Sequence, residues 1–342
     1  MKAMALHHLG NLASHPEPLT LDDWPDPVPG EGELLVRVSA CGVCHTELDE
    51  IEGRLPPPQL PVVLGHQVVG RVEAAGPHAS LFRPGDRVGI AWIYSACGHC
   101  HYCRSGRENL CPEFKATGRD ANGGYAQYLT VSERFAYAIP SGFTDVAAAP
   151  LLCAGAIGYR SLALTDLQDG QNLGLTGFGA SAHLVLQLAR HRYPHSNVFV
   201  FSRSPEEQAF ALELGAVWAG NTEAESPEKL AGCIDTTPAW KPVVEALKNL
   251  APGGRLVINA IRKEAADQAW LLQLDYPHHL WQEKEIKSVA NVTRNDVSGF
   301  LQVADEMKLT PEVQEFALAE ANRALGELKS RKIRGAKVLR VD

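Results

Sequence analysis

Short alternations of apolar and polar residues, separated by glycine- and proline-containing turns, mark the chain from about residue 30 to residue 140. Residues 33–38 (ELLVRV), 68–76 (VVGRVEAAG) and 84–90 (PGDRVGI) follow this pattern. Such runs are typical of short strands cut by turns. The pattern predicts a β-rich, barrel-like domain in this part of the chain.

A different pattern occupies residues 153–290, where strand-like and helix-like segments alternate. Residues 173–176 (LGLT) and 198–201 (VFVF) read as strands, residues 183–190 have helical apolar spacing, and residues 206–214 predict a second helix. Alternation of this kind indicates βαβ units around a parallel sheet. The predicted fold class is therefore α/β, with a β-rich domain beside a parallel-sheet domain.

A glycine-rich turn joins the first of these strands to its helix. Glycine suits this place because a backbone without Cβ turns tightly and lets a pyrophosphate approach the helix N-terminus. The turn predicts a dinucleotide site, and the alternative is an ordinary strand-to-helix turn. The residues that fit the pattern G-x-G-x-x-A are Gly177, Phe178, Gly179, Ala180, Ser181 and Ala182.

The end of the second strand bears on the choice of cofactor. A carboxylate there would bind the ribose 2′-hydroxyl of NAD, but the sequence reads Ser202, Arg203, Ser204. An arginine between two serines suits the 2′-phosphate of NADP, which a guanidinium can bind with two hydrogen bonds. We therefore favour NADP(H) over NAD(H). The alternative is that Arg203 is a solvated loop residue.

Composition and charge exclude several classes of partner. The chain has 342 residues, 45% of them hydrophobic, which suffices for two domains with buried cores. The net charge of −8 provides no basic stripe, so no nucleic-acid partner is expected. We find no run of the roughly 20 apolar residues that a membrane span requires, and no signal-length run in residues 1–16. We therefore expect no membrane partner and a cytoplasmic location with reduced thiols.

Half of the eight cysteines fall in one run, CGHCHYCRSGRENLC. Reduced cysteines at this spacing favour a metal over disulfides, and four thiolates close a tetrahedral zinc shell. We therefore expect a structural zinc lobe at about residues 92–112, with His99 and His101 exposed. The predicted ligands are Cys97, Cys100, Cys103 and Cys111.

A sparser set of metal ligands is scattered over the chain. Cys44, His66 and Cys153 would bind an ion through two thiolates and one imidazole, leaving a fourth position for water or substrate. Cys41 and Cys233 are not needed as ligands, and we interpret both as small buried apolar residues.

The order of these motifs resembles that of the zinc-containing medium-chain alcohol dehydrogenases over essentially the whole chain. The matching segments are CGVCHT, GHQVVGRV, the cysteine lobe, GGYA at 123–126, PLLCAG at 150–155, the glycine motif and IRGAKV at 333–338. The resemblance implies a GroES-like catalytic domain over 1–153 and a Rossmann domain with a doubly wound parallel sheet over 154–290. Residues 291–342 would return to the catalytic domain, and nicotinamide would lie beside the catalytic zinc in the cleft between the domains.

Two cysteines and one histidine form the established catalytic zinc shell of alcohol dehydrogenases, in which zinc lowers the pKa of an alcohol before hydride passes to nicotinamide. The resemblance therefore implies an enzyme with two zinc ions per chain that interconverts primary alcohols and aldehydes. Together with the preference for NADP(H) drawn from Arg203, it leads us to expect chiefly NADPH-dependent aldehyde reduction. Thr46 matches the family's hydroxyl that takes the substrate proton, or it is an ordinary loop threonine. Arg334, in the terminal motif, is assigned to cofactor binding.

The chain departs from the family pattern at several positions around the predicted zinc. Gln67 stands where the family generally has glutamate, so carboxylate coordination there is in doubt. Asp49 occupies the place of a proton-relay histidine. Glu47 replaces an aspartate that orients the zinc histidine, and its longer side chain is expected to reach His66. His45 falls at a basic position near the pyrophosphate, or it is a surface imidazole.

Substrate and assembly follow from the resemblance alone. Apolar pocket walls favour an apolar primary alcohol or aldehyde over a polyol. The connector at residues 112–122 is short, and longer insertions occur in dimeric relatives, so a tetramer is favoured over a dimer. The predicted pocket residues, which are otherwise ordinary core, are Trp92, Ile93, Ile261 and Val289, with Tyr94 flanking them.

Two other functions stay open from the sequence. A zinc-free quinone or enoyl reductase of the same superfamily conflicts with the presence of Cys44, His66 and Cys153 together. A noncatalytic, zinc-stapled NADP-binding sensor or scaffold is compatible with the motifs, although the intact ligand set argues against it.

Overall fold

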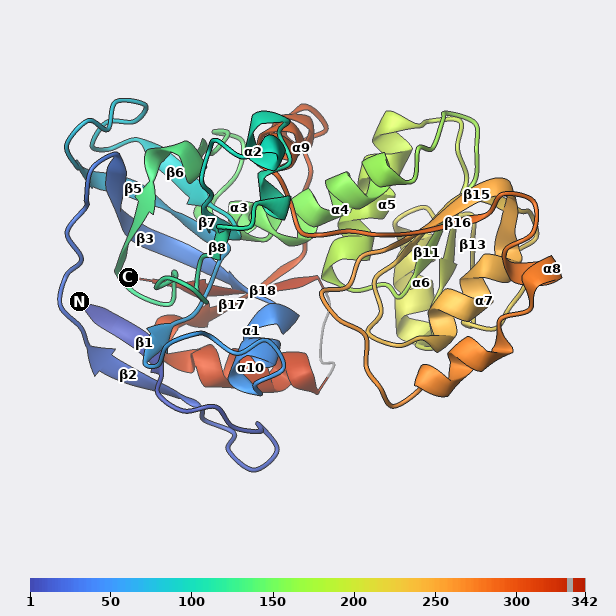
Figure 1. Cartoon of the computed structure of the whole chain (residues 1–342), viewed down its shortest axis with the longest axis horizontal. Helices are drawn as coiled ribbons and strands as arrows, with labels where there is room; N and C mark the ends of the chain where they lie inside the picture. The colour runs from blue at the N-terminus through green and yellow to red at the C-terminus, as the bar shows by residue number, and fades with distance from the viewer. Residues whose placement is uncertain (331–334, 342) are drawn as a thin grey trace. The chain divides into compact units, whose positions relative to one another are not determined.

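The chain forms two units, shown in the computed structural model of Figure 1, which describes residues 1–330 and 335–341. Unit 1 contains Met1–Ala156 and Val292–Asp342, and unit 2 contains Ile157–Asn291. Unit 1 is therefore built from both ends of the chain.

Strand β3 (Glu33–Val43) is the centre of unit 1. Buried and more exposed positions alternate over its first residues, as a strand with one face in the core requires. It pairs antiparallel with β5 (Val68–Ala75), β9 (Tyr128–Ser132) and β18 (Ala336–Arg340), and the sheet order is β10-β6-β5-β3-β18-β17. In Figure 1 the red C-terminal strand β18 accordingly lies beside the blue N-terminal β3.

The other elements of unit 1 complete the β-rich domain predicted from the sequence. Its remaining strands are β1 (Lys2–Leu6), β2 (Leu19–Asp23), β4 (Val62–Val63), β6 (Arg87–Ile90), β7 (Ile93–Ser95), β8 (Lys115–Ala116), β10 (Ala136–Ala138) and β17 (Val313–Ala317). Its α-helices are α1 (His45–Ile51), α2 (His101–Arg104), α3 (Asp145–Ala148), α9 (Arg294–Glu306) and α10 (Ala321–Lys329). Its 3₁₀ turns are η1 (Glu108–Leu110), η2 (Glu133–Phe135), η3 (Ala149–Leu152) and η5 (Leu318–Glu320).

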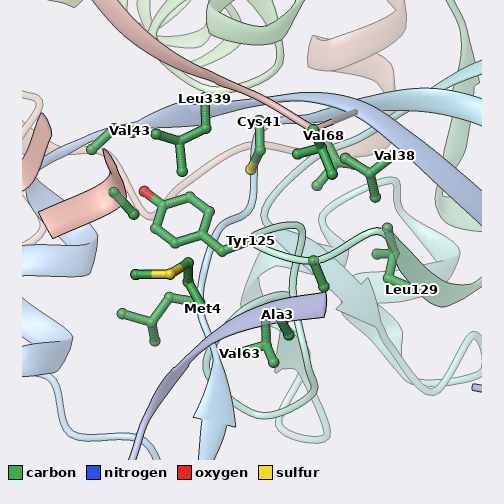
Figure 2. Close-up of a cluster of buried hydrophobic side chains, with 14 of the residues drawn as sticks. Ala3, Met4, Val38, Cys41, Val43, Val63, Val68, Tyr125, Leu129 and Leu339 are labelled. Carbon is green, nitrogen blue, oxygen red and sulfur yellow. The ribbon is translucent and has the colours of Figure 1, made fainter. Parts of the chain in front are cut away.

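A fully buried tyrosine, Tyr125, lies in the core of unit 1 among apolar side chains from several strands (Figure 2). Its ring packs against Gly65, where a Cβ would lie 2.4 Å from the ring atom Cδ1. Gly65 also has φ of +97°, so this position favours glycine on both counts. The tyrosine and the glycine together fix the loop that carries His66.

Unit 2 is a parallel sheet in the order β13-β12-β11-β14-β15-β16. Numbered from β11, this is the order 3-2-1-4-5-6 of doubly wound dinucleotide-binding sheets. The strands are β11 (Leu173–Thr176), β12 (Val198–Phe201), β13 (Trp218–Gly220), β14 (Leu230–Asp235), β15 (Leu250–Ile258) and β16 (Glu285–Ser288). The helices are α5 (Ala180–Arg192), α6 (Pro205–Glu213), α7 (Lys241–Asn249), α8 (Tyr276–His279) and the 3₁₀ turn η4 (Gln268–Gln273), while α4 (Ala154–Leu164) begins in unit 1.

The stretch Asp145–Leu164 corrects one sequence-based expectation. Its length and apolar composition are sufficient to cross a membrane, whereas the sequence analysis found no such stretch. It contains α3, η3, Cys153 and α4, and 56% of its apolar window is buried inside the fold. Burial of this kind explains the composition, because a helix in a protein core is also rich in apolar residues.

Candidate active site

Three separate segments of unit 1 bring the predicted catalytic ligands together. Cys44 is the N-cap of α1, His66 follows β4, and Cys153 lies between η3 and α4. The three donor atoms lie within 4.8 Å of one another, and His66 Nε2 is 3.6 Å from Cys44 Sγ and 3.3 Å from Cys153 Sγ. Tetrahedral zinc bonds to sulfur and nitrogen would separate such donors by about 3.5 Å. The residues therefore fit a zinc ion with one coordination position left over.

Glu47 contacts two of the three predicted metal ligands. Its Oε1 lies 2.7 Å from His66 Nδ1, and its Oε2 accepts a 2.8 Å hydrogen bond from the Cys44 backbone N–H. His66 therefore turns Nε2 toward the thiols and Nδ1 toward a carboxylate, the arrangement usual for a metal-binding histidine.

The electrostatics of the group favour a cation. Burial lowers the pKa of His66, but the Glu47 and Cys44 charges outweigh it and raise that pKa well above its usual value. The neighbouring Cys153 thiol, burial and Glu47 raise the pKa of the Cys44 thiol. A positive ion among these donors would offset the negative charge of Glu47, which contributes to both shifts.

The cysteine lobe gathers its thiols as the spacing predicts. All four sulfurs lie within 4.8 Å of one another, and backbone N–H groups of Cys97, Cys100 and Cys103 each donate to a sulfur of the group at 3.4 to 3.5 Å. The backbone bond from Cys103 lowers the pKa of Cys100 to about 7, whereas burial raises that of Cys103 to about 12. His99 and His101 are exposed as predicted. The four sulfurs fit a closed metal shell, while Cys41 and Cys233 are fully buried elsewhere.

The positions that depart from the family pattern lie close to the ligands. Gln67 is buried against Gly42, where a Cβ would lie 2.5 Å from its Oε1. Asp49 is buried, and its Oδ1 forms a 2.6 Å ion pair with Arg54 Nε. This pairing gives no support to the proton-relay assignment of Asp49, which stays a prediction.

Residues at the start of α1 and next to β7 lie near the predicted metal ligands. His45 is exposed, and the half-buried Thr46 donates its backbone N–H to Cys44 Sγ at 3.4 Å. Trp92 places its ring edge-on to His66 with 4.9 Å between ring centroids. Ile93 is fully buried in the hydrophobic core of unit 1, so its position gives no support to a pocket role.

The remaining pocket predictions fall in unit 2. Ile261 is 51% exposed on the loop after β15, and Val289 is buried just beyond β16. Their roles stay predictions. Arg334, assigned to the cofactor, lies outside the described residues.

The glycine turn of unit 2 has the features of an anion site. Gly177 has φ of +75°, and a Cβ on Gly179 would have nothing within 4 Å, so the space beside it is open. Gly179 is the N-cap of α5 and has no side chain that could cap the helix, so an anion at this turn would meet the helix N-terminus. Phe178 turns inward against Phe210, and Ala180 and Ser181 begin the helix. The turn therefore fits a pyrophosphate.

The tip of β12 contains a group that the sequence analysis missed. Glu207, in the first turn of α6, accepts a hydrogen bond from Ser202 Oγ, so a carboxylate does lie at the tip. Ser204 caps α6 by accepting from the Glu207 backbone N–H at 3.2 Å. Arg203 is exposed. The hydrogen bond from Lys241 is the main cause that lowers the pKa of Glu223, and the charge of Arg203 makes a smaller contribution in the same direction. A cap signal of serine followed three residues later by glutamate could have placed this carboxylate.

Comparison with known proteins identifies the family. Residues 30–141 match the model of the alcohol dehydrogenase GroES-like domain. The chain is 43% identical over 318 residues to a probable alcohol dehydrogenase, AdhA, of Mycobacterium tuberculosis (strain CDC 1551 / Oshkosh), covering 92% of this chain and 90% of that relative. It is 33% identical over 337 residues to an alcohol dehydrogenase of Geobacillus stearothermophilus, covering 95% of this chain and 97% of that one.

A solved structure shares the whole fold. Cinnamyl alcohol dehydrogenase SbCAD4 from Sorghum bicolor superposes with a TM-score of 0.83 at 26% identity, over 99% of this chain and 97% of that one. The predicted combination of a GroES-like domain and a Rossmann domain is thereby confirmed. The chain belongs to the zinc-containing medium-chain alcohol dehydrogenase family.

Proposed function

We propose that this chain is a zinc-dependent oxidoreductase that interconverts primary alcohols and aldehydes and favours NADPH-dependent aldehyde reduction. Its relatives named as alcohol dehydrogenases support oxidoreduction of an alcohol. The observation that carries the proposal is the grouping of Cys44, His66 and Cys153, whose donor atoms lie within 4.8 Å of one another. Such a set leaves one coordination position for a substrate oxygen.

The chain's own residues hold, orient and shield the reacting groups. When bound, zinc supplies a Lewis acid and the dinucleotide supplies or accepts the hydride. Glu47 keeps His66 turned with Nε2 toward the thiols. In this proposal the hydroxyl of Thr46, half-buried two residues beyond Cys44, would accept the proton of the alcohol oxygen while releasing its own proton toward the ribose of a bound cofactor. In aldehyde reduction the same transfer would run in reverse. Trp92, beside His66, provides an apolar wall that favours apolar substrates over polyols.

Metal analysis and one substitution test the catalytic assignment. The wild-type protein should contain two zinc ions per chain, and Cys44→Ser should lose turnover and one zinc ion while keeping the fold. Zinc content, kinetics with a series of alcohols and aldehydes, and circular dichroism measure these properties. Turnover retained in C44S would refute the role of Cys44. A single zinc ion in the wild type would favour a sensor, a scaffold or a zinc-free reductase.

The preference for NADP(H) rests on Arg203. Its exposed guanidinium at the end of β12 supports binding of a 2′-phosphate, whereas the carboxylate of Glu207 at Ser202 opposes it. Arg203→Ala should raise the Michaelis constant for NADPH far more than that for NADH. Equal effects on the two cofactors would reject the phosphate role.

We also propose a homo-oligomer, with a tetramer favoured over a dimer, acting on a small molecule in the cytoplasm. Strand β16 supports self-association, because it ends the sheet order of unit 2 and all four of its residues are exposed. Multi-angle light scattering measures the mass of the assembly. A monomeric mass would contradict this part of the proposal.

A further inference from the structure

A buried lysine lies at the carboxyl ends of the unit 2 strands. Lys263, on the loop after β15, is 8% exposed at its side chain, and its ion-pair partner Asp235, the last residue of β14, is fully buried. The Lys263 ammonium donates to Asp235 Oδ2, to the Thr237 carbonyl at 2.8 Å and to the Ala239 carbonyl at 2.9 Å. An ammonium has three hydrogens, so each has a partner. Lys263 thus ties the loop after β15 to the loop after β14.

Asp235 extends this connection to the glycine turn. Its Oδ1 accepts from Thr176 Oγ1 at 2.6 Å and from Thr237 Oγ1 at 2.8 Å. Thr176 ends β11 and directly precedes Gly177, where a Cβ would lie 3.0 Å from both Thr236 Oγ1 and Thr237 Cγ2. The loop held by Lys263 is therefore the surface against which the glycine turn packs.

The order of the strands shows where this loop lies in the sheet. The chain runs from β11 to β12 on one side, and β14 lies on the other side of β11. Ligands of parallel sheets bind at the carboxyl ends of the strands where the order reverses in this way. The Thr176 to Asp235 hydrogen bond crosses that point. Neither the glycine motif nor the zinc ligands involve Lys263 or Asp235.

We propose that Lys263 is a positioning residue for the dinucleotide, holding the loops after β14 and β15 in the conformation that receives it. The proposal rests on the proposed function, because it takes a nicotinamide dinucleotide as the ligand of this edge. Because a buried ion pair adds little net stability compared with an apolar pair, we attribute this one to fixing the conformation of the two loops.

Cofactor binding by a lysine variant tests the proposal. In zinc-loaded Lys263→Met, the dissociation constants of both NADPH and NADH, measured by calorimetry, should rise at least about tenfold, because three hydrogen bonds from a charged donor are lost. Lys284→Met is the matched control. Lys284 also donates to two backbone carbonyls, those of Leu247 at 3.0 Å and His278 at 2.8 Å, but it precedes β16 at the amino end of the sheet. K284M should keep wild-type dissociation constants.

A double variant separates positioning from folding. K263M alone leaves a buried carboxylate without its cation, so its melting temperature should fall. D235N in the K263M background removes that charge and should recover the melting temperature, while cofactor binding stays weak. Recovery of binding together with stability, or wild-type binding in K263M, would overturn the positioning role. Absence of dinucleotide binding in the wild type would overturn the proposed function and this proposal with it.

Discussion

At the scale of single residues, Glu47 makes two different contacts at the predicted catalytic site. One oxygen caps the Cys44 backbone N–H, and the other lies 2.7 Å from His66 Nδ1. Glu47→Gln keeps an oxygen for the cap but removes the charge beside the imidazole. We expect E47Q to lower the zinc affinity of the three-ligand site by about 10- to 100-fold, the usual effect of losing such a partner.

Competition with a chelator, followed by zinc analysis, measures this affinity. A zinc ion bound by the cysteine lobe would be an internal control, because none of the lobe ligands contacts Glu47 in the described structure. Unchanged affinity at the three-ligand site would contradict the positioning role of Glu47.

Glu207 leads to a prediction about cofactor choice. Its carboxylate bonds to Ser202 Oγ and would repel a 2′-phosphate, whereas it could accept a hydrogen bond from a 2′-hydroxyl. We expect Glu207→Gln to raise the ratio of kcat/KM for NADPH to that for NADH several-fold. Glu206→Gln, which removes an equal charge bonded to Ser204 instead, should change the ratio much less. Equal shifts in both variants would point to net charge and not to the Ser202 contact.

The grouping of the four lobe cysteines could be predicted from sequence because their spacing is local. Cys44, His66 and Cys153 lie far apart in the sequence, so their grouping rested on residue type and on the order of the family motifs. The contacts around them could not be predicted, since Ser202 meets Glu207 only through the turn that starts α6, and Asp49 meets Arg54 only beyond the end of α1. Ile93 was predicted to line a pocket, and its burial in the core gives that prediction no support. Which face a side chain takes depends on register, which a short strand does not reveal in its sequence.

At the scale of elements, the predicted strands at residues 173–176 and 198–201 are confirmed residue for residue as β11 and β12. Buried parallel strands are continuous apolar runs with clear ends. Strand β3 was predicted over 33–38 but extends to Val43. Its second half is buried on both faces and contains glycine and cysteine, so the alternation that marked its beginning is lost.

Glu52 connects two helices that are far apart in sequence. It is the C-cap of α1, accepts hydrogen bonds from Lys329 of α10 and from the Leu12 backbone, and forms an ion pair with Arg54. Burial raises its pKa, but the bonds from Lys329 and Arg54 outweigh this and lower the pKa to about 2. A lowered pKa stabilises the folded state above the ordinary value of 4.5, and this stability is lost as the pH falls toward 2.

We expect Glu52→Gln to reduce the free energy of unfolding at pH 7 by at most about 3 kcal/mol, the equivalent of the pKa shift. The difference in the free energy of unfolding between this variant and the wild type should become smaller as the pH falls below 4.5. Urea unfolding at several pH values measures this, with the exposed Glu17→Gln as a control for loss of one carboxylate. A difference that does not change with pH would show that Glu52 acts by packing and not by charge.

At the scale of the whole molecule, the prediction that the C-terminal segment returns to unit 1 rested only on the family resemblance. Strand β18 completes the sheet beside β3, but an alternating pattern does not state which strand is its neighbour. The sequence analysis also missed the apolar stretch Asp145–Leu164. Its apolar residues are interrupted by arginine, serine and glycine, and its helical continuity through η3 becomes evident only in the fold.

The two predicted zinc sites should differ in how they release metal. The three-ligand site has an open coordination position, whereas the lobe closes its shell with four thiols. We expect a chelator to remove the first zinc early, with loss of turnover and little change in circular dichroism. A metallochromic dye, activity and thermal unfolding followed on one sample measure the order of these events.

Loss of the lobe zinc should come later and should destabilise unit 1. Glu108, within the lobe, accepts hydrogen bonds from the backbone N–H of Arg294 at 2.7 Å and from its Nε at 3.0 Å. Arg294 is the first residue of α9, so the lobe holds the start of the helix with which the chain re-enters unit 1. Without its metal the lobe would release Glu108, and the melting temperature should fall only in this second phase. Release of both ions in one phase, together with unfolding, would contradict separate catalytic and structural sites.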